Sequence, residues 1–385
     1  MIIAGEASGD MHGARLVRAI KKHSPDAFVF GVGANAMQSE GARIIVDSRK
    51  LSVVGLTEVI SKLPTIYRAM GSVKKYLQRL RPNLLILIDF PDFNFRVAAV
   101  AKKLSIPVLY YISPQIWAWR QNRVKKIKRL VDHMAVILPF EASFYRKHGV
   151  PVTFVGHPLL DRIPPAYARP SKPLDSEKPI IGLLPGSREK EVTTLLPIML
   201  QAAQRIDHSR PAVKFLVSCS TSIKEDLLED IFRQYAGALD VSIVKGPVEP
   251  IFKESCVLVG ASGTVTLEAA LHGTPTVIVY KVSPLSYWLG KRLIKVDYIG
   301  IANLIAKKQL MPELIQEDAS PQPIAETVIR MVSEPEKLRQ LEKELLGVRK
   351  LLGGAGASDR VAKIAFDLIQ RSEKKSSSPE RTVPI

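Results

Sequence analysis

Short apolar runs of strand length alternate with longer segments whose apolar residues recur at helical spacing, from the first residue to about residue 320. This alternation is typical of repeated βα units around a mostly parallel sheet. In the first half, the predicted strands cover residues 1–4, 27–31, 84–88, 107–111, 133–138 and 152–155. In the second half, they cover residues 180–184, 212–218, 241–244, 256–260 and 275–280. The pattern predicts an α/β protein.

A proline-rich segment separates the two series of strands. Residues 158–179 contain six prolines and cannot continue a helix or a central strand. We therefore expect two Rossmann-like, doubly wound domains with a cleft between them, residues 1–157 and 180–335, joined by this linker. Residues 336–370 are predicted to be helical. Residues 371–385 lack apolar periodicity and are predicted to be disordered.

The charge balance of the chain limits the classes of binding partner that we expect. The chain of 385 residues has 55 Lys and Arg against 37 Asp and Glu, a net charge of +18, which favours phosphorylated metabolites, acidic membrane surfaces or nucleic acid. No signature of an RNA- or DNA-binding module is present, so we expect no nucleic-acid partner. Cys219 and Cys256 stand alone, which indicates a reducing cytoplasm and neither a disulfide framework nor a zinc site. The apolar runs are far shorter than the roughly 20 residues of a membrane span.

In parallel sheets, ligands bind beyond the carboxyl ends of the strands, so polar residues that follow a strand are candidates. The segment 4–10, AGEASGD, lets the chain turn before a helix expected to start near Asp10 or Met11. It matches neither a Walker A loop nor a dinucleotide fingerprint. For Gly5, Ser8 and Gly9, a purely structural turn and a ligand contact both remain open.

Asp89 follows the buried strand 84–88, and the nearby Phe90 and Phe93 are expected to form apolar walls around it. Apolar walls raise the pKa of a carboxyl group, and Asp89 is therefore a candidate general base. Structural hydrogen bonding is the alternative role. Asp92 is expected to cap the helix that follows.

Two further segments of the second half carry small and polar residues at a predicted helix start. The first segment, with Gly186, Ser187 and Arg188, is a candidate diphosphate site, and a capped helix with a solvated charge cluster is the alternative. The second segment, residues 262–268, also has small and polar residues at a predicted helix start, and it adds a carboxylate that can bind sugar hydroxyls. Its candidate residues are Ser262, Gly263, Thr264 and Glu268. His272 is expected to end that helix rather than to act in catalysis.

Basic, aromatic stretches at residues 117–129 and 281–292 suit an anionic lipid surface, where each cation adds about 1 kcal/mol. The alternative is a solvated helix face with tryptophan in the core.

Seven strings occur in order along the chain: AGEASGD (4–10), VVGLTEV (53–59), IDFPDFN (88–94), YYISPQIWAWR (110–120), LLPGSR (183–188), SGTVTLE (262–268) and DYIGIANLIA (297–306). Together they resemble the lipid-A-disaccharide synthase family. The resemblance implies a GT-B glycosyltransferase, with the acceptor side in the N-terminal domain and the nucleotide-sugar side in the C-terminal domain. It also suggests that helices after residue 336 cross back to the N-terminal domain.

The resemblance implies an inverting transfer from UDP-2,3-diacylglucosamine to 2,3-diacylglucosamine 1-phosphate, which gives the β-1,6-linked disaccharide 1-phosphate and UDP in lipid A biosynthesis. Such an enzyme would lie in the cytoplasm, at the anionic surface of the inner membrane of a Gram-negative cell. GT-B enzymes generally need no catalytic metal and this chain has no DxD motif, so we expect no metal and no cofactor. The oligomeric state is left open, a homodimer included.

The resemblance also assigns roles to residues. Asp89 matches the family's proposed catalytic aspartate, and Asn303 matches an asparagine important for activity. Arg188 and the helix start at Gly263 and Thr264 would stabilise the departing UDP. The remaining matches are Glu268 on the donor side, and Glu6 and Ser8, with the adjacent Gly9, in the N-terminal cleft motif. Residues 51–70 would dock acyl chains or form an ordinary amphipathic core helix.

Two other functions compete with this interpretation. One is a UDP-sugar epimerase or a peptidoglycan-building transferase of the same fold, against which the strings IDFPDFN and SPQIWAWR argue. The other is a basic nucleotide- or RNA-binding protein without catalysis, which salt-sensitive RNA binding without UDP release would favour.

Overall fold

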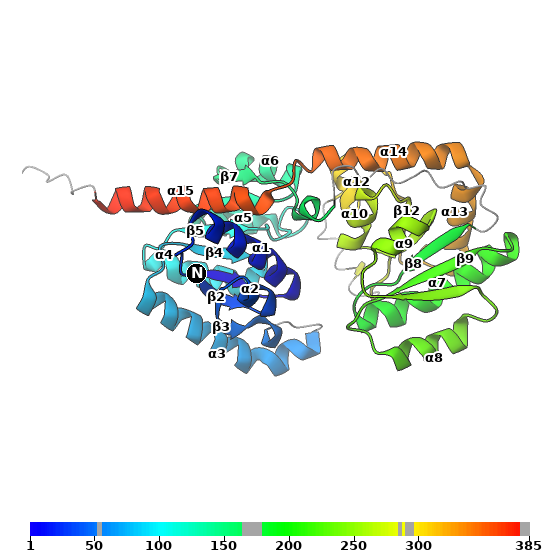
Figure 1. The fold of residues 1–385 in the computed structure, drawn as a ribbon, viewed down its shortest axis with the longest axis horizontal. Coiled ribbons are helices and arrows are strands. Elements are labelled where there is room, and N and C mark those ends of the chain that lie inside the picture. Colours follow the sequence, from blue (N-terminus) through cyan, green and yellow to red (C-terminus); the bar gives the residue numbers. More distant parts are fainter. Residues whose placement is uncertain (52–55, 164–178, 284–286, 289–295, 378–385) are drawn as a thin grey trace, which may run out of the picture. The chain divides into compact units, whose positions relative to one another are not determined.

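The computed structural model describes residues 1–51, 56–163, 179–283, 287–288 and 296–377 (Figure 1). The chain divides into two compact units. Unit 1 consists of Met1–Arg162 together with Leu352–Ile385, and unit 2 consists of Ile163–Leu351. Each unit has its own sheet and its own hydrophobic core.

Unit 1 is built on a seven-stranded parallel sheet of order β3-β2-β1-β4-β5-β6-β7. The strands are β1 (Ile2–Ala4), β2 (Phe30–Gly33), β3 (Arg43–Asp47), β4 (Leu85–Ile88), β5 (Val108–Tyr111), β6 (His133–Val136) and β7 (Val152–Phe154). The strand order reverses between β1 and β4, and in open parallel sheets ligands bind at the carboxyl edge of such a switch point. The residues that follow β1 and β4 therefore lie at the expected site.

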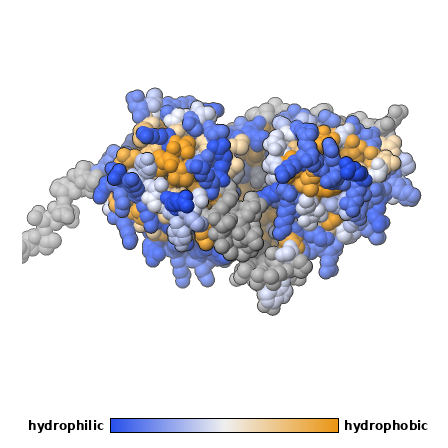
Figure 2. All heavy atoms as spheres, turned by 90° about the horizontal axis from the view of Figure 1, so that it is seen from below, coloured by the Kyte–Doolittle hydropathy of each residue, from blue (hydrophilic) through white to orange (hydrophobic). Residues whose placement is uncertain are grey.

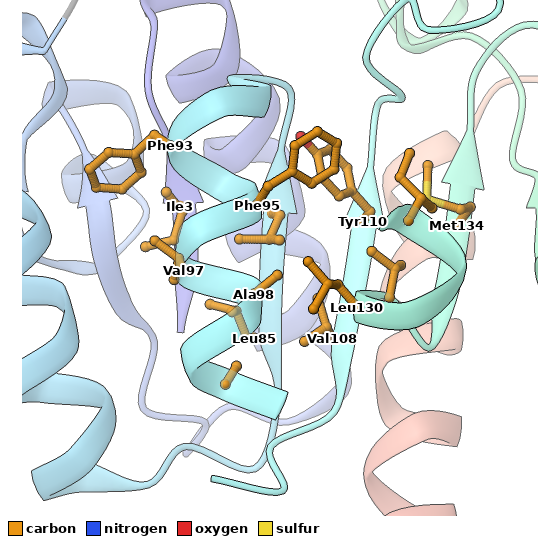
Figure 3. Close-up of a cluster of buried hydrophobic side chains, with 14 of the residues drawn as sticks. Ile3, Leu85, Phe93, Phe95, Val97, Ala98, Val108, Tyr110, Leu130 and Met134 are labelled. Atoms are coloured by element: carbon orange, nitrogen blue, oxygen red, sulfur yellow. The ribbon is translucent and has the colours of Figure 1, made fainter. Parts of the chain in front are cut away.

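Helices cover both faces of this sheet. One face carries α3 (Leu56–Leu80), α4 (Pro91–Lys103), α5 (Val124–Leu130) and α6 (Pro139–Lys147), and the other carries α1 (Ala7–His23), α2 (Asn35–Ser39) and α15 (Ala357–Ser377). Short 3-10 turns are η1 (Ser48–Lys50), η2 (Gln121–Arg123) and η3 (Pro158–Asp161). Figure 3 shows Phe95 and Val97 of α4 among the side chains of β1, β4 and β5. Strands buried on both faces explain the continuous apolar runs of the sequence.

Unit 2 has a six-stranded parallel sheet of order β10-β9-β8-β11-β12-β13, with its switch point between β8 and β11. The strands are β8 (Ile180–Leu184), β9 (Lys214–Cys219), β10 (Val241–Lys245), β11 (Val257–Ala261), β12 (Thr276–Tyr280) and β13 (Glu313–Ile315). The helices are α7 (Glu189–Ser209), α8 (Glu225–Tyr235), α9 (Glu249–Glu254), α10 (Thr264–Leu271), α12 (Ile301–Ala306), α13 (Pro321–Ser333) and α14 (Pro335–Leu351). The predicted α/β class with two doubly wound parallel sheets is confirmed.

Several sequence-based expectations differ from the structure. The sequence analysis missed the edge strands β3 and β13, although it predicted the other two edge strands, β7 and β10, which are also only partly buried. Helix α1 begins at Ala7 instead of near Asp10. The prediction of disorder from residue 371 is wrong for residues 371–377, which continue α15: a helix already fixed by packing adds further turns readily.

The expected linker and C-terminal helices divide between the units. Residues 158–161 form η3 within unit 1, whereas residues 164–178 lie outside the described residues, as do residues 378–385. Of the two C-terminal helices, α14 belongs to unit 2 and α15 to unit 1, where Val361, Ala362 and Ala365 enter the core beside α1. Among the described residues, no helix is both long and apolar enough to cross a membrane.

Candidate active site

Asp89 lies at the carboxyl end of β4, at the switch point of unit 1. Asp89 and Phe90 both have left-handed backbone conformations, with φ of 45° and 49°. The carbonyl oxygen of Asp89 accepts hydrogen bonds from the Tyr110 hydroxyl and from Asn94 Nδ2, both at 2.6 Å. Non-glycine residues pay an energy penalty in this region of φ and ψ, and such strain clusters at functional sites. The two hydrogen bonds therefore stabilise the strained backbone turn from which the Asp89 side chain projects.

The Asp89 carboxyl group has a perturbed acidity. Burial raises its pKa to about 6, the negative charge of Glu6 adds to the increase, and a backbone hydrogen bond from Phe90 opposes it. A general base works best when its pKa lies near the operating pH. The structure therefore gives Asp89 the acidity that a base near neutrality needs.

The segment that follows β1 lies against this turn. Gly5 approaches Phe90 so closely that a Cβ atom at position 5 would lie 2.3 Å from the Phe90 ring. This close approach explains why a residue without a side chain is needed here. Glu6 is the exposed N-cap residue of α1, and Ser8 is exposed in its first turn. Gly9 is buried against Ala4. The structure therefore brings Glu6 close enough to affect the acidity of Asp89.

Sequence analysis missed two buried carboxyl groups in unit 1. Asp10 accepts hydrogen bonds from the backbone N–H groups of Ala34, Ala36 and Met37, and so fixes the start of α2. Glu141 is 2% exposed in the first turn of α6. The Pro-x-Glu pattern at residues 139–141, typical of a helix start, was the signal that could have marked Glu141.

Unit 2 contains a cavity of about 550 Å³ at the carboxyl ends of β8, β9 and β11. This volume lies in the range of small-molecule sites. Six of the predicted nucleotide-sugar residues line it: Gly186, Ser187, Arg188, Ser262, Gly263 and Thr264. Small and polar residues that the sequence analysis missed line it as well, among them Ser218, Ser220, Thr221 and Gly246. Ser218 lies near the end of β9 and the other three follow β9 or β10, so the end of each strand was the available signal.

The first turn of α10 opens into this cavity. In the described part of the chain, the N–H groups of Gly263, Thr264 and Val265 have no protein acceptor. No atom lies within 4 Å of the place where a Cβ atom of Gly263 would stand. Unpaired N–H groups at a helix start attract anions, since the helix dipole adds to their partial charges. This turn suits a phosphate group.

The first turn of α7 is arranged differently from the sequence expectation. Glu191 accepts hydrogen bonds from the N–H groups of Ser187 at 3.0 Å and Arg188 at 3.3 Å, and it pairs with the Arg188 guanidinium at 3.1 Å. A carboxylate of the chain itself therefore occupies these two N–H groups. The Arg188 side chain is 61% exposed, which leaves guanidinium N–H groups for an anion in the cavity.

Two other predicted residues of unit 2 are buried. Asn303 is fully buried, and its side chain bonds Met311, Glu313 and the N–H group of Leu310. The Glu313 carboxylate in turn holds the N–H groups of residues 299 and 300. Glu268 is 9% exposed within α10 and is not among the residues that line the cavity. His272 ends α10, as the sequence predicted.

Comparison with known proteins places this geometry in a family. A family model described as lipid-A-disaccharide synthetase matches residues 1–365. The lipid-A-disaccharide synthase of Trichlorobacter lovleyi is 46% identical to this chain over 97% of it and 98% of the relative. That of Geobacter metallireducens is 44% identical, over 96% and 97%. The match thus extends over both units.

Solved structures share the fold at low sequence identity. The S. aureus MnaA-UDP co-structure has a TM-score of 0.66 at 12% identity, covering 96% of this chain and 97% of that one. The Acinetobacter baumannii MurG structure has a TM-score of 0.60 at 14% identity, covering 95% and 98%. These likenesses concern the fold alone, and they confirm the expected GT-B fold class. Because the relatives of high identity are synthases, the chain belongs to the lipid-A-disaccharide synthetase family.

Proposed function

We propose that this chain is an inverting glycosyltransferase that condenses UDP-2,3-diacylglucosamine with 2,3-diacylglucosamine 1-phosphate. The products are the β-1,6-linked disaccharide 1-phosphate and UDP. The observation that carries the proposal is the 46% identity to a lipid-A-disaccharide synthase over 97% of the chain. Two features support it further. Asp89 in unit 1 has a pKa of about 6, which suits a general base, and the cavity in unit 2 has groups that suit a phosphate.

In this proposal, Asp89 acts as the general base. Its carboxylate takes the proton of the acceptor 6-hydroxyl while that oxygen forms a bond to the anomeric carbon of the donor. The bond from the anomeric carbon to UDP breaks on the opposite face of the sugar, so the configuration inverts. The pKa of about 6 keeps Asp89 ionised above neutrality and leaves it basic enough to hold the proton.

The leaving UDP gains negative charge as the bond breaks. In this proposal, the Arg188 guanidinium and the N–H groups at the start of α10 stabilise that charge. Glu191 stabilises the loop of residues 186–188, because its carboxylate accepts hydrogen bonds from the N–H groups of Ser187 and Arg188. Asn303 positions the loop before α12 through Glu313 and does not touch substrate. Glu268 is assigned to the donor side, as the family resemblance implies.

That the reaction needs no metal and no cofactor stays a prediction. In this proposal, Arg188 and the N–H groups at the start of α10 supply the positive charge.

We also propose that the chain meets an anionic membrane surface peripherally, on the cytoplasmic face. Helix α5 carries four exposed cations among its seven residues, Lys125, Lys126, Lys128 and Arg129. Leu63 and Tyr67, one turn apart in α3, are 40% and 63% exposed. Figure 2, which is seen from below, shows hydrophobic residues among hydrophilic ones on the face of unit 1 where α3 lies in Figure 1.

The test is UDP release in detergent micelles from UDP-2,3-diacylglucosamine, with and without the acceptor and with EDTA present. We expect acceptor-dependent release that Asp89→Asn abolishes. Asp92→Asn is the matched control, because Asp92 is exposed and forms an ion pair with Arg123 at 2.9 Å. Failure of the wild-type protein to turn over these substrates, while it still binds UDP, would reject the proposed reaction.

A further inference from the structure

The segment 112–120 connects β5 to η2, at the same carboxyl edge of the unit 1 sheet as Asp89. Its two ends are strained, because Ile112 and Arg120 have left-handed φ values of 62° and 57°. For a β-branched residue such as isoleucine, a positive φ is a genuine outlier. Strain of this kind persists only where surrounding contacts enforce it, and it is concentrated at functional sites.

Buried polar contacts from α6 enforce this conformation. The Trp117 indole N–H donates to Glu141 Oε1 at 3.0 Å, while Glu141 Oε2 accepts from the N–H of Leu138 at 3.0 Å. The Ser113 hydroxyl bonds the Tyr145 hydroxyl at 2.6 Å. The ring of Trp117 also packs edge-on against Phe140, with centroids 4.6 Å apart. A buried carboxyl group is costly in a fold, and here it fixes a surface segment.

Burial raises the pKa of Glu141 to about 8, and the hydrogen bonds from Leu138 and Trp117 only partly offset this effect. The negative charge of Asp89 adds a smaller contribution to the increase. Near neutrality Glu141 is therefore largely uncharged. The uncharged Glu141 side chain thus holds the segment 112–120 through Trp117 and adds no negative charge to the surroundings of Asp89.

The fixed segment presents one exposed cation. The Arg120 guanidinium lies over the Trp119 ring, 4.2 Å from its centroid, and Trp119 is 38% exposed. In the described part of the chain, no carboxylate forms an ion pair with Arg120. By contrast, the neighbouring Arg123 pairs with Asp92 in the first turn of α4, three residues after Asp89. Arg120 thus stacks on Trp119, three residues after the anchored Trp117 and three residues before Arg123, which pairs with the helix that follows the base.

We propose that Arg120 binds the phosphate of the acceptor sugar, and that Glu141 is a positioning residue that fixes Arg120 through Trp117. The inference rests on the proposed function, in which the acceptor carries a phosphate monoester. A guanidinium whose orientation is set before binding loses little entropy when it forms paired hydrogen bonds to phosphate oxygens. The segment would thereby select a phosphorylated acceptor and orient its 6-hydroxyl toward Asp89.

The experiment compares 2,3-diacylglucosamine 1-phosphate with the same sugar lacking the phosphate, in nonionic micelles. The quantity of interest is the ratio of kcat/KM for the two acceptors. We expect Arg120→Ala to lower this ratio on the order of 10- to 100-fold, the range for a charge-assisted pair. Lys147→Ala, which removes an exposed cation at the far end of α6, should leave the ratio unchanged.

Three results would overturn the role of Arg120. The first is an equal loss with both acceptors, and the second is a wild-type ratio near one. The third is a loss that occurs only when anionic lipid is added to the micelles, because Arg120 would then bind the lipid surface. Absence of acceptor-dependent UDP release by the wild type would instead reject the proposed function.

A double-mutant cycle tests the role of Glu141. Glu141→Gln keeps the volume of the side chain but loses one acceptor, and Trp117→Phe keeps the aromatic packing but removes the indole N–H. Both should raise KM for the phosphorylated acceptor more than they lower kcat, and leave KM for the UDP-sugar unchanged. If Glu141 acts through Trp117, the double variant has the KM of the more impaired single variant. Additive increases in KM would contradict this role.

Discussion

Replacing Asp89 by asparagine should change stability and activity in opposite directions. The pKa of Asp89 is about 6 in the folded chain against the ordinary 3.8, mainly because of burial. That difference of about 2 units corresponds to ~3 kcal/mol. Because the folded-state pKa is raised, the group contributes its stability fully below pH 3.8 and loses it as the pH rises through about 6.

Asparagine removes this penalty with little change in geometry. It adopts the left-handed conformation of residue 89 as readily as aspartate does, and it leaves the carbonyl bonds from Tyr110 and Asn94 in place. Burial of the unpaired amide costs part of the gain, so we expect Asp89→Asn to stabilise unit 1 by about 1–2 kcal/mol at pH 8. Below pH 4, where Asp89 is neutral in both states, the gain should disappear. Loss of the base should lower kcat by roughly 10²- to 10⁴-fold.

Unfolding in urea at several pH values, followed by the fluorescence of Trp117 and Trp119, measures the first effect. Both tryptophans lie in unit 1, and a Trp288→Phe background removes the one in unit 2. UDP release measures the second effect. A stability difference between the variant and the wild type that is the same at pH 4 and pH 8 would refute the raised pKa. Activity within about tenfold of the wild type would refute the role of Asp89 as base.

Three further predictions concern the remaining site residues. Glu6→Gln should shift the acid limb of the kcat/KM profile to lower pH, because the charge of Glu6 raises the pKa of Asp89; an unmoved limb would contradict this coupling. Arg188→Ala should lower kcat by about 100-fold, as expected for loss of a group that stabilises a leaving anion, and Arg188→Lys should recover only part of it in the UDP-release assay. Asn303→Ala should destabilise unit 2 by about 1–3 kcal/mol in urea titrations, since it leaves buried groups of Leu310, Met311 and Glu313 without a partner; a variant of unchanged stability with low kcat would instead indicate contact with substrate.

The fold class and the position of the central strands follow from the amino-acid sequence alone. Central parallel strands are buried on both faces, so they appear as continuous apolar runs such as residues 84–88. Edge strands give a weaker signal because they are only partly buried: β7 and β10 were predicted, whereas Arg43–Asp47 and Glu313–Ile315 were not. The sequence also identified residues at strand ends, because position at the end of a strand is a local property. Asp89 and the cavity-lining Gly186 and Ser262 were found in this way.

The contacts of each polar side chain follow from the tertiary fold and not from the local sequence. Glu141 is bonded to Trp117 because the segment that follows β5 folds onto α6, and Asn303 is fully bonded because residues 310–313 fold back onto it. Glu191, rather than a ligand, occupies two N–H groups at the start of α7. Helix α15 belongs to unit 1 through its contacts with α1, more than 330 residues away in sequence. Burial, hydrogen-bond partners and pKa depend also on residues that are distant along the chain, so a local pattern does not determine them.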